Sequence, residues 1–400
     1  MESEVKSFAD LKNEVLRWLE SMRITSCQYK MDEHSDSSIF TTCFALFILD
    51  LFRESNKLSE KEKQNWITNI QCFQNKKHGY FEPETYFHAD KERNCYQLTC
   101  FCLSALKILN TNPRWPLTFV DEIWPTKEDI KKYLYERGCH EGCRGSGNKA
   151  MFLGIFLTYE YERTSRKDLL EKLNAWFDFH NKTQNPQSGF WGNAKSTYYY
   201  RGMQNAFHQF EIYYYWKRPI NYIEEVVNNT LKIQNRDGSF SPIPGGEGCH
   251  DYDAIHILAN SYLKKDYKRE EIAASLHKAT KAIIQNKNGD GGFCQAKRTP
   301  KNFIDLFKMF RQFFFGLEPY IWAQRLKASV AAVLMKKTEN HTGWVKSTRK
   351  VDRSNLWDTW FRCLSLAEIA QTLNDCNNSS NEQKIRFHKM IGLGNFDNQF

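Results

Sequence analysis

Two kinds of apolar pattern alternate along the chain. In one kind, the segment is apolar on nearly every side of a helix, which is typical of buried helices. Seven such segments occur, at 38–52, 96–109, 150–161, 202–216, 251–263, 326–337 and 356–370. Between them lie amphipathic segments such as REEIAASLHKATKAIIQN (269–286). The alternation predicts helical hairpins, each with an amphipathic outer helix and an apolar inner helix.

A short turn element recurs at a period of about 50 residues. Its fullest copy is QNRDGSF, from Gln234 to Phe240, where a Gln-Asn pair precedes a glycine and an aromatic residue. Glycine adopts the left-handed backbone that ends a helix, and Asn or Asp beside it tolerates a tight turn. The glycines of the aromatic copies are Gly79, Gly189, Gly238, Gly291 and Gly343, and a copy without the aromatic residue spans 138–145. We expect these turns at one end of the molecule, each followed by a buried aromatic side chain.

A repeat of this kind predicts one closed all-α domain over residues 1–400, because each hairpin must pack on its neighbours. The architecture is an α/α toroid of about six hairpins, an (α/α)6 barrel. Residues 1–30 are expected to form an outer N-terminal helix and residues 372–400 a polar tail. The N-terminal ends of inner helices present free amide groups and partial positive charge at one mouth of the central cavity. Polar residues at that mouth are therefore the first candidates for function.

The amino-acid composition limits which classes of molecule we expect this protein to bind. The chain is 41% hydrophobic and 26% charged, which excludes a disordered protein. Its 29 Phe, 19 Tyr and 11 Trp supply either core or the aromatic wall of a cavity. The net charge of +9 is scattered without a long basic stripe, so we expect no nucleic-acid partner. The charge is compatible with an anionic small-molecule substrate or a peripheral membrane contact.

The cysteines and the N-terminus favour a cytoplasmic location. Several of the 12 cysteines, including Cys43, Cys100 and Cys363, lie in apolar helical stretches, where free thiols suit a reducing compartment. The first residues, MESEVKSFADLKNEVLRWLE, are charged and amphipathic, unlike a secretory signal. No run reaches 18 apolar residues, so no transmembrane helix is expected.

The densest group of candidate side chains opens the fifth apolar segment. His250, Asp251, Asp253 and His256 follow a glycine-rich turn, and spacings of three place His250, Asp253 and His256 on one helical face. A carboxylic acid kept neutral in an apolar cavity is a strong general acid, so Asp253 is the candidate proton donor. The alternative is that Asp251 caps the helix and Asp253 makes only local bonds.

Two further groups complete the candidate site. Asp358 and Arg362 stand four apart beside Trp357 and Trp360, so they can pair along their helix or serve as an acid and an anion-binding group. Gln204, Phe207 and His208 open the fourth apolar segment, where His208 is either a core histidine or a base. The predicted catalytic residues are therefore Asp253, Asp251, His250, His208 and Asp358. The predicted substrate-binding residues are Arg362, Trp357, Trp360, His256, Gln204 and Phe207.

The Gln-x-x-x-Gly-x-aromatic turn resembles the repeat of the terpenoid cyclase and protein prenyltransferase superfamily of α/α toroids. The copy from Gln234 to Phe240 has its spacing, with Phe in place of the usual Trp. The segment around Asp253 resembles the Asp-x-Asp-Asp motif of cyclases that protonate an alkene, with Asp253 as its middle acid and Ala254 in place of its last. The chain also resembles bacterial toroid proteins that have the same Asp-Tyr-Asp-Ala and Thr-Trp-Phe-Arg helices. This second resemblance implies no particular activity.

The resemblance implies a cyclase-like or prenyltransferase-like enzyme that acts on an isoprenoid in the cavity. Protein prenyltransferases bind zinc through Asp, Cys and His at this mouth; Cys249 and Asp251 occur here, but segment 326–337 contains no His. We therefore assign no metal ligand and no cofactor, with zinc or magnesium left open. Two alternatives stand beside this function. One is a carbohydrate-active lyase or hydrolase of the (α/α)6 type, acting on a glycan, and the other is a non-catalytic binding toroid.

Overall fold

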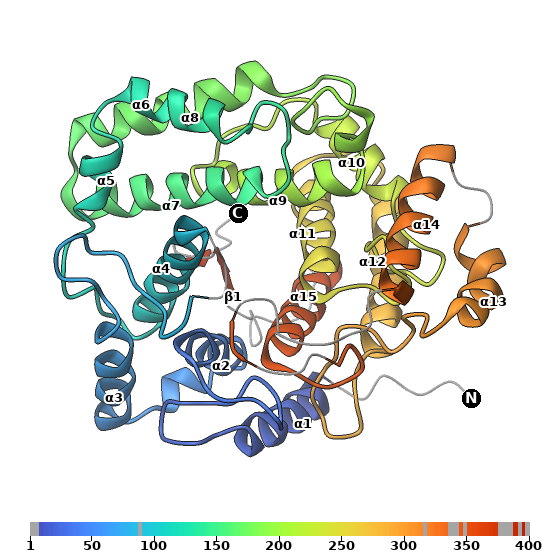
Figure 1. Cartoon of the computed structure of the whole chain (residues 1–400), viewed down its shortest axis with the longest axis horizontal. Coiled ribbons are helices and arrows are strands. Elements are labelled where there is room, and N and C mark those ends of the chain that lie inside the picture. The colour runs from blue at the N-terminus through green and yellow to red at the C-terminus, as the bar shows by residue number, and fades with distance from the viewer. Residues whose placement is uncertain are drawn as a thin grey trace.

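The inner helices of the described chain form a closed ring (Figure 1). The computed structural model describes residues 8–86, 90–314, 318–334, 344–346, 350–374, 387–390 and 394–396. The ring consists of α2 (Ile39–Leu51), α4 (Lys91–Ile108), α7 (Ser146–Thr164), α9 (Tyr200–Tyr215), α11 (Gly248–Lys264) and α15 (Leu356–Asn374). Each helix contacts the next in this order, and α15 contacts α2. The predicted α/α toroid is confirmed, with these helices at the inner positions.

Local sequence explains why inner and outer helices differ. Helix α2 begins at Ser38, whose side chain accepts the backbone N–H of Thr41, and it buries every side chain from Ile39 to Ile48. Outer helix α3 (Glu60–Gln71) begins at a Ser59–Glu62 capping box and buries only Trp66 and Ile70, which lie on one face. The other outer helices are α1 (Phe8–Ser21), α6 (Lys127–Glu136), α8 (Lys167–Thr183), α10 (Ile223–Lys232) and α12 (Arg269–Ile284). Short helices η1 (Ser55–Lys57), α5 (Phe119–Ile123) and η2 (Lys195–Thr197) connect them.

The recurring glutamine joins neighbouring hairpins. Its amide nitrogen donates to the carbonyl of the turn glycine and to a carbonyl of the next outer segment. These bonds run from Gln74 to Gly79 (2.7 Å) and Trp115 (2.7 Å), from Gln184 to Gly189 (2.8 Å) and Asn221 (2.9 Å), and from Gln234 to Gly238 (3.0 Å) and Ser275 (2.8 Å). Aromatic residues after the turns are buried, as predicted: Phe81, Phe190, Trp191, Phe240, Phe293 and Trp344. Gly343 lies outside the described residues.

We expect Gly238→Val to lower the free energy of unfolding by at least about 1 kcal/mol. Gly238 has a φ of +100°, and a Cβ there would lie 2.2 Å from the carbonyl oxygen of Lys278. Chemical denaturation should show the loss. Gly289→Ala is the matched control, since no atom lies within 4 Å of a Cβ at that turn position. Equal stability of the Gly238→Val chain and the wild type would contradict a structural role for the turn.

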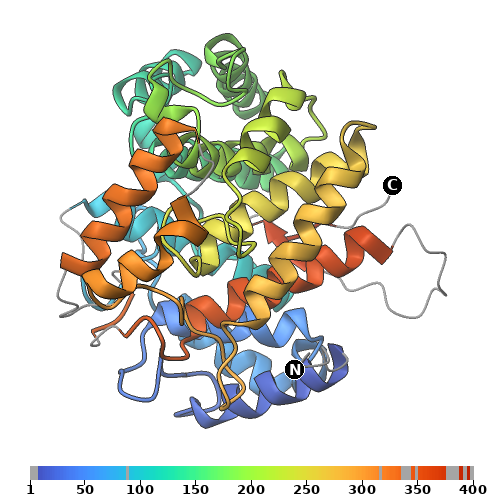
Figure 2. The same cartoon turned by 90° about the vertical axis from the view of Figure 1, so that its right-hand side faces the viewer.

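The prediction that segment 326–337 lines the central axis is wrong. Residues 326–334 belong to α14 (Pro319–Leu334), which pairs with α13 (Phe303–Phe314) on the outside of the ring (Figures 1 and 2). Residues 335–337 lie outside the described residues. In space, the turn at Phe293 contacts the start of α15 instead. The backbone N–H of Asn355, which immediately precedes α15, donates to the Phe293 carbonyl. Helix α14 is apolar on several sides because it packs on α13, so its pattern imitates that of an inner helix.

The predicted tail, residues 372–400, supplies the end of α15 and two short described strands. Strands β1 (Phe387–Met390) and β2 (Gly394–Phe396) pair antiparallel beside α2 and α4, inside the outline of the ring (Figure 1). The fold remains helical, since these strands form a single short hairpin. Among the described residues, we find no helix with the length and apolar character that spanning a membrane requires.

Candidate functional site

A cavity of about 840 Å³ opens at the N-terminal ends of the inner helices. Its walls come from α4, α7, α9, α11 and α15 and from the loops that precede them. Side chains predicted from sequence meet here from three helices: His208, Gln204, Phe207, His250, Asp253, Trp357 and Asp358. The inner helices run in the same direction around the ring, so their first turns lie at one level. The volume lies within the range typical of ligand-binding pockets.

Asp253 and His250 form one charged corner of this cavity. Burial raises the pKa of Asp253 well above its usual value, and the nearby positive charge of His250 only partly opposes this. Burial disfavours the charged form of His250, but the carboxylate of Glu247, 2.6 Å from its Nδ1, more than compensates and raises the pKa of His250 to about 9. Burial thus favours the protonated form of the Asp253 carboxyl group, and Glu247 favours the imidazolium form of His250.

Glu247 positions this imidazolium and was not predicted as a site residue. Its Oε1 accepts a hydrogen bond from Gln295 (2.9 Å) and its Oε2 accepts one from Ser241 (3.0 Å). Glu247 is also the residue immediately before α11, so the helix start fixes where its carboxylate points. The signal for Glu247 in the sequence was its place in the glycine-rich turn that precedes this helix.

His208 is a neutral imidazole in the cavity wall. Burial, reinforced by the charge of His250, lowers the pKa of His208 to about 3. Its Nδ1 has no hydrogen-bond partner among the described residues. Gln204 lies one turn earlier on α9 and lines the same cavity. His208 therefore keeps a buried ring nitrogen without a partner among the described residues and is only a weak base.

Aromatic rings cover much of the remaining wall. Trp357 packs 4.9 Å from Trp344 and 4.7 Å from Phe361, measured between ring centroids, and Phe101 lies 6.2 Å from Trp357. Phe207 also lines the cavity. Ring faces are electron-rich and attract cations, so this wall suits an apolar molecule on which positive charge develops.

A basic rim faces the carboxyl corner and was missed by sequence reasoning. Arg93 on α4 and Arg144 before α7 line the mouth, and neither guanidinium has an ion-pair partner within the described chain. Partial burial and the charge of Arg144 lower the pKa of Arg93, against the opposing charge of Asp90. Lys149 also lines the mouth but pairs with Asp90 at 3.1 Å. Two like charges that repel each other indicate room for an anion. The sequence did contain a signal for both residues, namely their position: Arg93 lies in the first turn of an inner helix and Arg144 just before one.

Four predicted site residues do not line the cavity. Arg362 is fully buried, pairs with Asp251 at 2.5 Å and donates to the carbonyl of Gln295 at 2.7 Å. The spacing within α15 suggested a pair with Asp358, but Arg362 reaches across to α11 because the two helices pack together. Asp251 also accepts the backbone N–H groups of Phe240 (2.6 Å) and Glu247 (3.2 Å). Both side chains hold the turn before α11 and lie outside the cavity lining.

The other two belong to the core. His256 pairs with Glu368 at 3.0 Å in the interior between α11 and α15. Trp360 stacks on Phe44, with 5.8 Å between ring centroids. Each lies on a face of its inner helix that packs against a neighbouring helix. The sequence of a single helix does not reveal which face meets a neighbour and which meets the cavity. In the described part of the chain, no group of three His, Cys, Asp or Glu is placed to hold a metal ion.

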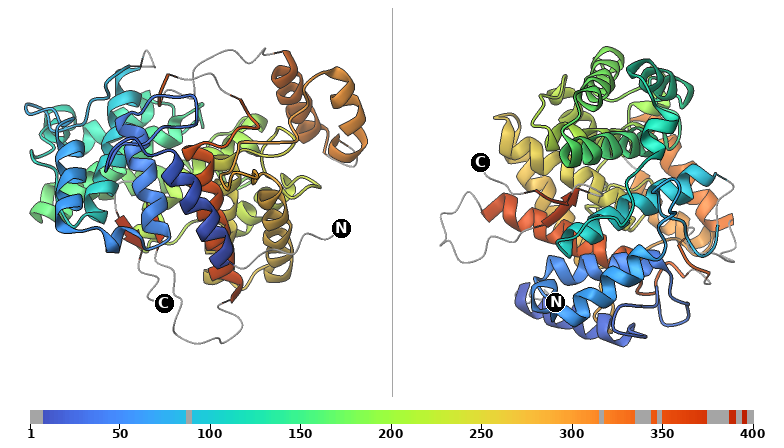
Figure 3. Two further views of the ribbon diagram at one scale, coloured as in Figure 1. Left: turned by 90° about the horizontal axis from the view of Figure 1, so that it is seen from below. Right: turned by 90° about the vertical axis from the view of Figure 1, so that its left-hand side faces the viewer.

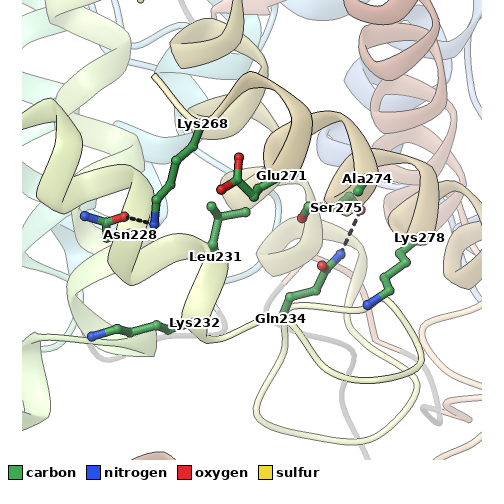
Figure 4. Close-up of a pocket in the computed structure, with 9 residues that line it drawn as sticks. All are labelled: Asn228, Leu231, Lys232, Gln234, Lys268, Glu271, Ala274, Ser275 and Lys278. Atoms are coloured by element: carbon green, nitrogen blue, oxygen red, sulfur yellow. Dashed lines mark hydrogen bonds between the residues drawn. The ribbon is translucent and has the colours of Figure 1, made fainter. Parts of the chain in front are cut away.

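A separate hollow lies on the outside of the ring between α10 and α12 (Figure 4). Its volume is about 600 Å³, and three lysines, Lys232, Lys268 and Lys278, surround it. Lys268 donates to the side-chain oxygen of Asn228 at 2.7 Å. The repeat residue Gln234 crosses its floor to the carbonyl of Ser275. The hollow is thus a gap between hairpins that the repeat glutamine bridges.

Comparison with known proteins agrees with the fold. The sequence matches the model of the prenyltransferase alpha-alpha toroid domain over residues 2–150 and 161–300. A structure of an arginine-to-alanine variant of the type II terpene cyclase MstE from Scytonema, with its substrate geranylgeranyl dihydroxybenzoate, superposes with a TM-score of 0.51. It shares 12% identity, and the match covers 91% of this chain and 97% of that one, which shows the fold alone.

A second solved structure is less similar. It is an aspartate-to-asparagine variant of unsaturated glucuronyl hydrolase from Streptococcus agalactiae, with a TM-score of 0.45 and 12% identity over 90% of this chain and 89% of that one. No curated protein matches the sequence.

Proposed function

Because the chain belongs to the prenyltransferase alpha-alpha toroid domain family, we propose that its cavity binds an isoprenoid and that Asp253 starts the reaction by donating a proton to it. One observation carries this proposal: a carboxyl group whose pKa is raised by burial lies in an aromatic-walled cavity. A group with a raised pKa in such a place is a general acid at neutral pH.

The chemistry proceeds as a proton-initiated cyclisation. The carboxyl proton of Asp253 adds to a terminal alkene, whose π electrons form the new C–H bond and leave a tertiary carbocation. A second alkene of the same chain attacks that cation and closes a ring. Faces of Trp357, Phe361 and Phe207 stabilise the migrating charge. The cation finally loses a proton, so that the product is an isomer of the substrate.

His250 and His208 have distinct parts in this scheme. The His250 imidazolium stabilises the Asp253 carboxylate that proton donation leaves behind, since opposite charges attract strongly in a buried site. His250 lies three residues, about one helical turn, before Asp253, whereas Ala254 occupies the position of the family motif's last aspartate. His208 accepts the final proton. A pKa of about 3 suffices for that step, because a carbocation is a far stronger acid.

The basic rim defines the other end of the substrate. We assign Arg93 and Arg144 to an anionic headgroup, a diphosphate or a carboxylate, held at the mouth while the isoprenoid chain extends toward Asp253. Guanidinium groups suit this role because they bind such anions with two parallel hydrogen bonds. The substrate class is thus an isoprenoid with a charged head.

Incubation with geranylgeranyl diphosphate in D2O tests the proposal. We expect a cyclic product that keeps its diphosphate and carries one solvent-derived deuterium on carbon, as detected by mass spectrometry after dephosphorylation. Farnesyl diphosphate and squalene serve as a shorter and an uncharged comparison, and squalene should react least because it lacks an anionic head. Release of pyrophosphate, a product without deuterium, or no product from any of these compounds would contradict the proposal.

A further inference from the structure

Helices α13 and α14 form a hairpin that stands outside the ring (Figure 3). They share a small core of their own, in which Leu306 packs against Trp322, Leu326 and Val330. This core is separate from the main core of the ring, to which Ile321 of α14 also contributes. The hairpin is therefore an addition to the toroid, and the ring closes without it.

The outward face of α13 is apolar. Phe303, Ile304 and Phe307 are 55%, 66% and 80% exposed, and their spacing of one and four residues places them on one side of the helix. Leu306 is buried and packs against α14. A helix of a protein surface normally turns charged residues to solvent, so three large apolar side chains on that side indicate a contact surface.

Basic side chains lie on and near this face of α13. Lys308 follows Phe307 and is exposed on the same side of α13. Lys297, Arg298 and Lys301, which precede α13, are exposed as well, and residues 297–334 contain only two acids. Both acids are engaged: Asp305 accepts the backbone N–H of Lys301 at 3.2 Å, and Glu318 pairs with Lys232 at 3.3 Å. The surface is thus complementary to something both apolar and anionic.

The hairpin is fixed beside the cavity mouth. Arg325 of α14 is buried and donates to the hydroxyl of Tyr200, the first residue of α9, at 2.6 Å. It also donates to the carbonyl of Ile233 at 3.0 Å. In Figure 2 the orange hairpin lies on the same side as the N-terminal end of the red helix α15. The contact surface therefore lies at the same end of the ring as the opening of the cavity.

We propose that α13 binds the surface of an anionic lipid bilayer, with Phe303, Ile304 and Phe307 at the boundary of headgroups and acyl chains and Lys308 among the lipid phosphates. A second copy of this chain fits the surface less well. A stable dimer buries about 800 Å² on each partner. Three side chains of this size, only partly exposed, offer roughly half of that area. A bilayer needs no matching protein surface and attracts the basic residues as well.

Vesicle co-sedimentation of the full chain tests this inference without any assay of turnover. We expect binding to mixed phosphatidylcholine–phosphatidylglycerol vesicles, weaker binding to phosphatidylcholine alone, and a decline at high salt. The triple variant F303S/I304S/F307S should lower the partition coefficient by about tenfold or more, and Lys308→Glu by about fivefold or more.

Ile123→Ser and Tyr135→Ser provide the matched controls, because these apolar side chains are exposed at 45% and 65% on other helices. Both should bind vesicles as the wild type does. Hydrogen–deuterium exchange of the wild type should show protection of residues 303–308 by vesicles, a readout that needs no variant to fold. Absence of wild-type binding, equal binding by the triple variant, or a loss of dimer in place of a loss of vesicle binding would overturn the inference.

Discussion

Asp253→Asn is expected to lower kcat for the proposed cyclisation by about 10²- to 10⁴-fold, the usual contribution of a general acid. The amide keeps the shape of the carboxyl group but has no proton of comparable acidity to give. Stability should change little, because the described residues give the Asp253 carboxyl group no hydrogen-bond partner to lose. In the wild type, kcat should fall as the pH rises through the raised pKa of Asp253, since only the protonated form donates.

Glu211→Gln is the control that makes this experiment specific. Glu211 on the adjacent helix α9 is also buried, and burial, helped by the charges of Asp253 and Glu368, raises the pKa of this carboxyl group well above normal. It does not line the cavity. Glu211→Gln should therefore retain turnover. If Glu211→Gln abolished the reaction while Asp253→Asn spared it, the proton donor would be the wrong residue. Early melting of Asp253→Asn would instead mark Asp253 as structural.

Arg362→Met is expected to have the largest effect on stability, a loss of about 3–5 kcal/mol in the free energy of unfolding. Met fills a similar volume but leaves Asp251 as a buried carboxylate without its cation. Arg17→Met, on an exposed arginine of α1, should change stability by less than about 0.5 kcal/mol. Guanidinium denaturation at neutral pH would measure both variants.

The Arg362→Met deficit should depend on pH in a definite direction. Burial already raises the folded-state pKa of Asp251 above its unfolded value of about 3.9, against the opposing charge of Arg362, so removal of the guanidinium raises it further. The folded state then binds more protons than the unfolded state, so stability is lost as pH rises and recovered as pH falls. We expect a smaller deficit at acidic than at neutral pH, and a largely restored protein in the double variant D251N/R362M. A deficit that stayed constant with pH would contradict the ion-pair explanation.

Local patterns in the sequence determined the ring. Helices apolar on all sides must be buried, and the Gln-Asn-Gly-aromatic turns mark where each hairpin reverses, so the toroid and most of its inner helices followed from residues close together in the chain. The same logic located the first turns of α9, α11 and α15, and therefore placed His208, His250, Asp253 and Asp358 at one mouth.

Partners from other hairpins were decided only by the tertiary structure. Arg362 pairs with Asp251, far away in sequence, because α11 and α15 pack side by side, and no spacing within one helix reports that contact. Arg93 and Arg144 meet across the mouth because α4 and α7 are ring neighbours.

Helix α14 shows the limit of the sequence pattern most directly. Apolar residues on several sides report that a helix is covered, but they do not report whether the cover is the ring or another helix such as α13. Burial is a property that periodicity in one segment can predict, because it depends on that segment's own side chains. Which element does the burying depends on how the whole chain closes, and for this protein only the assembled ring determined it.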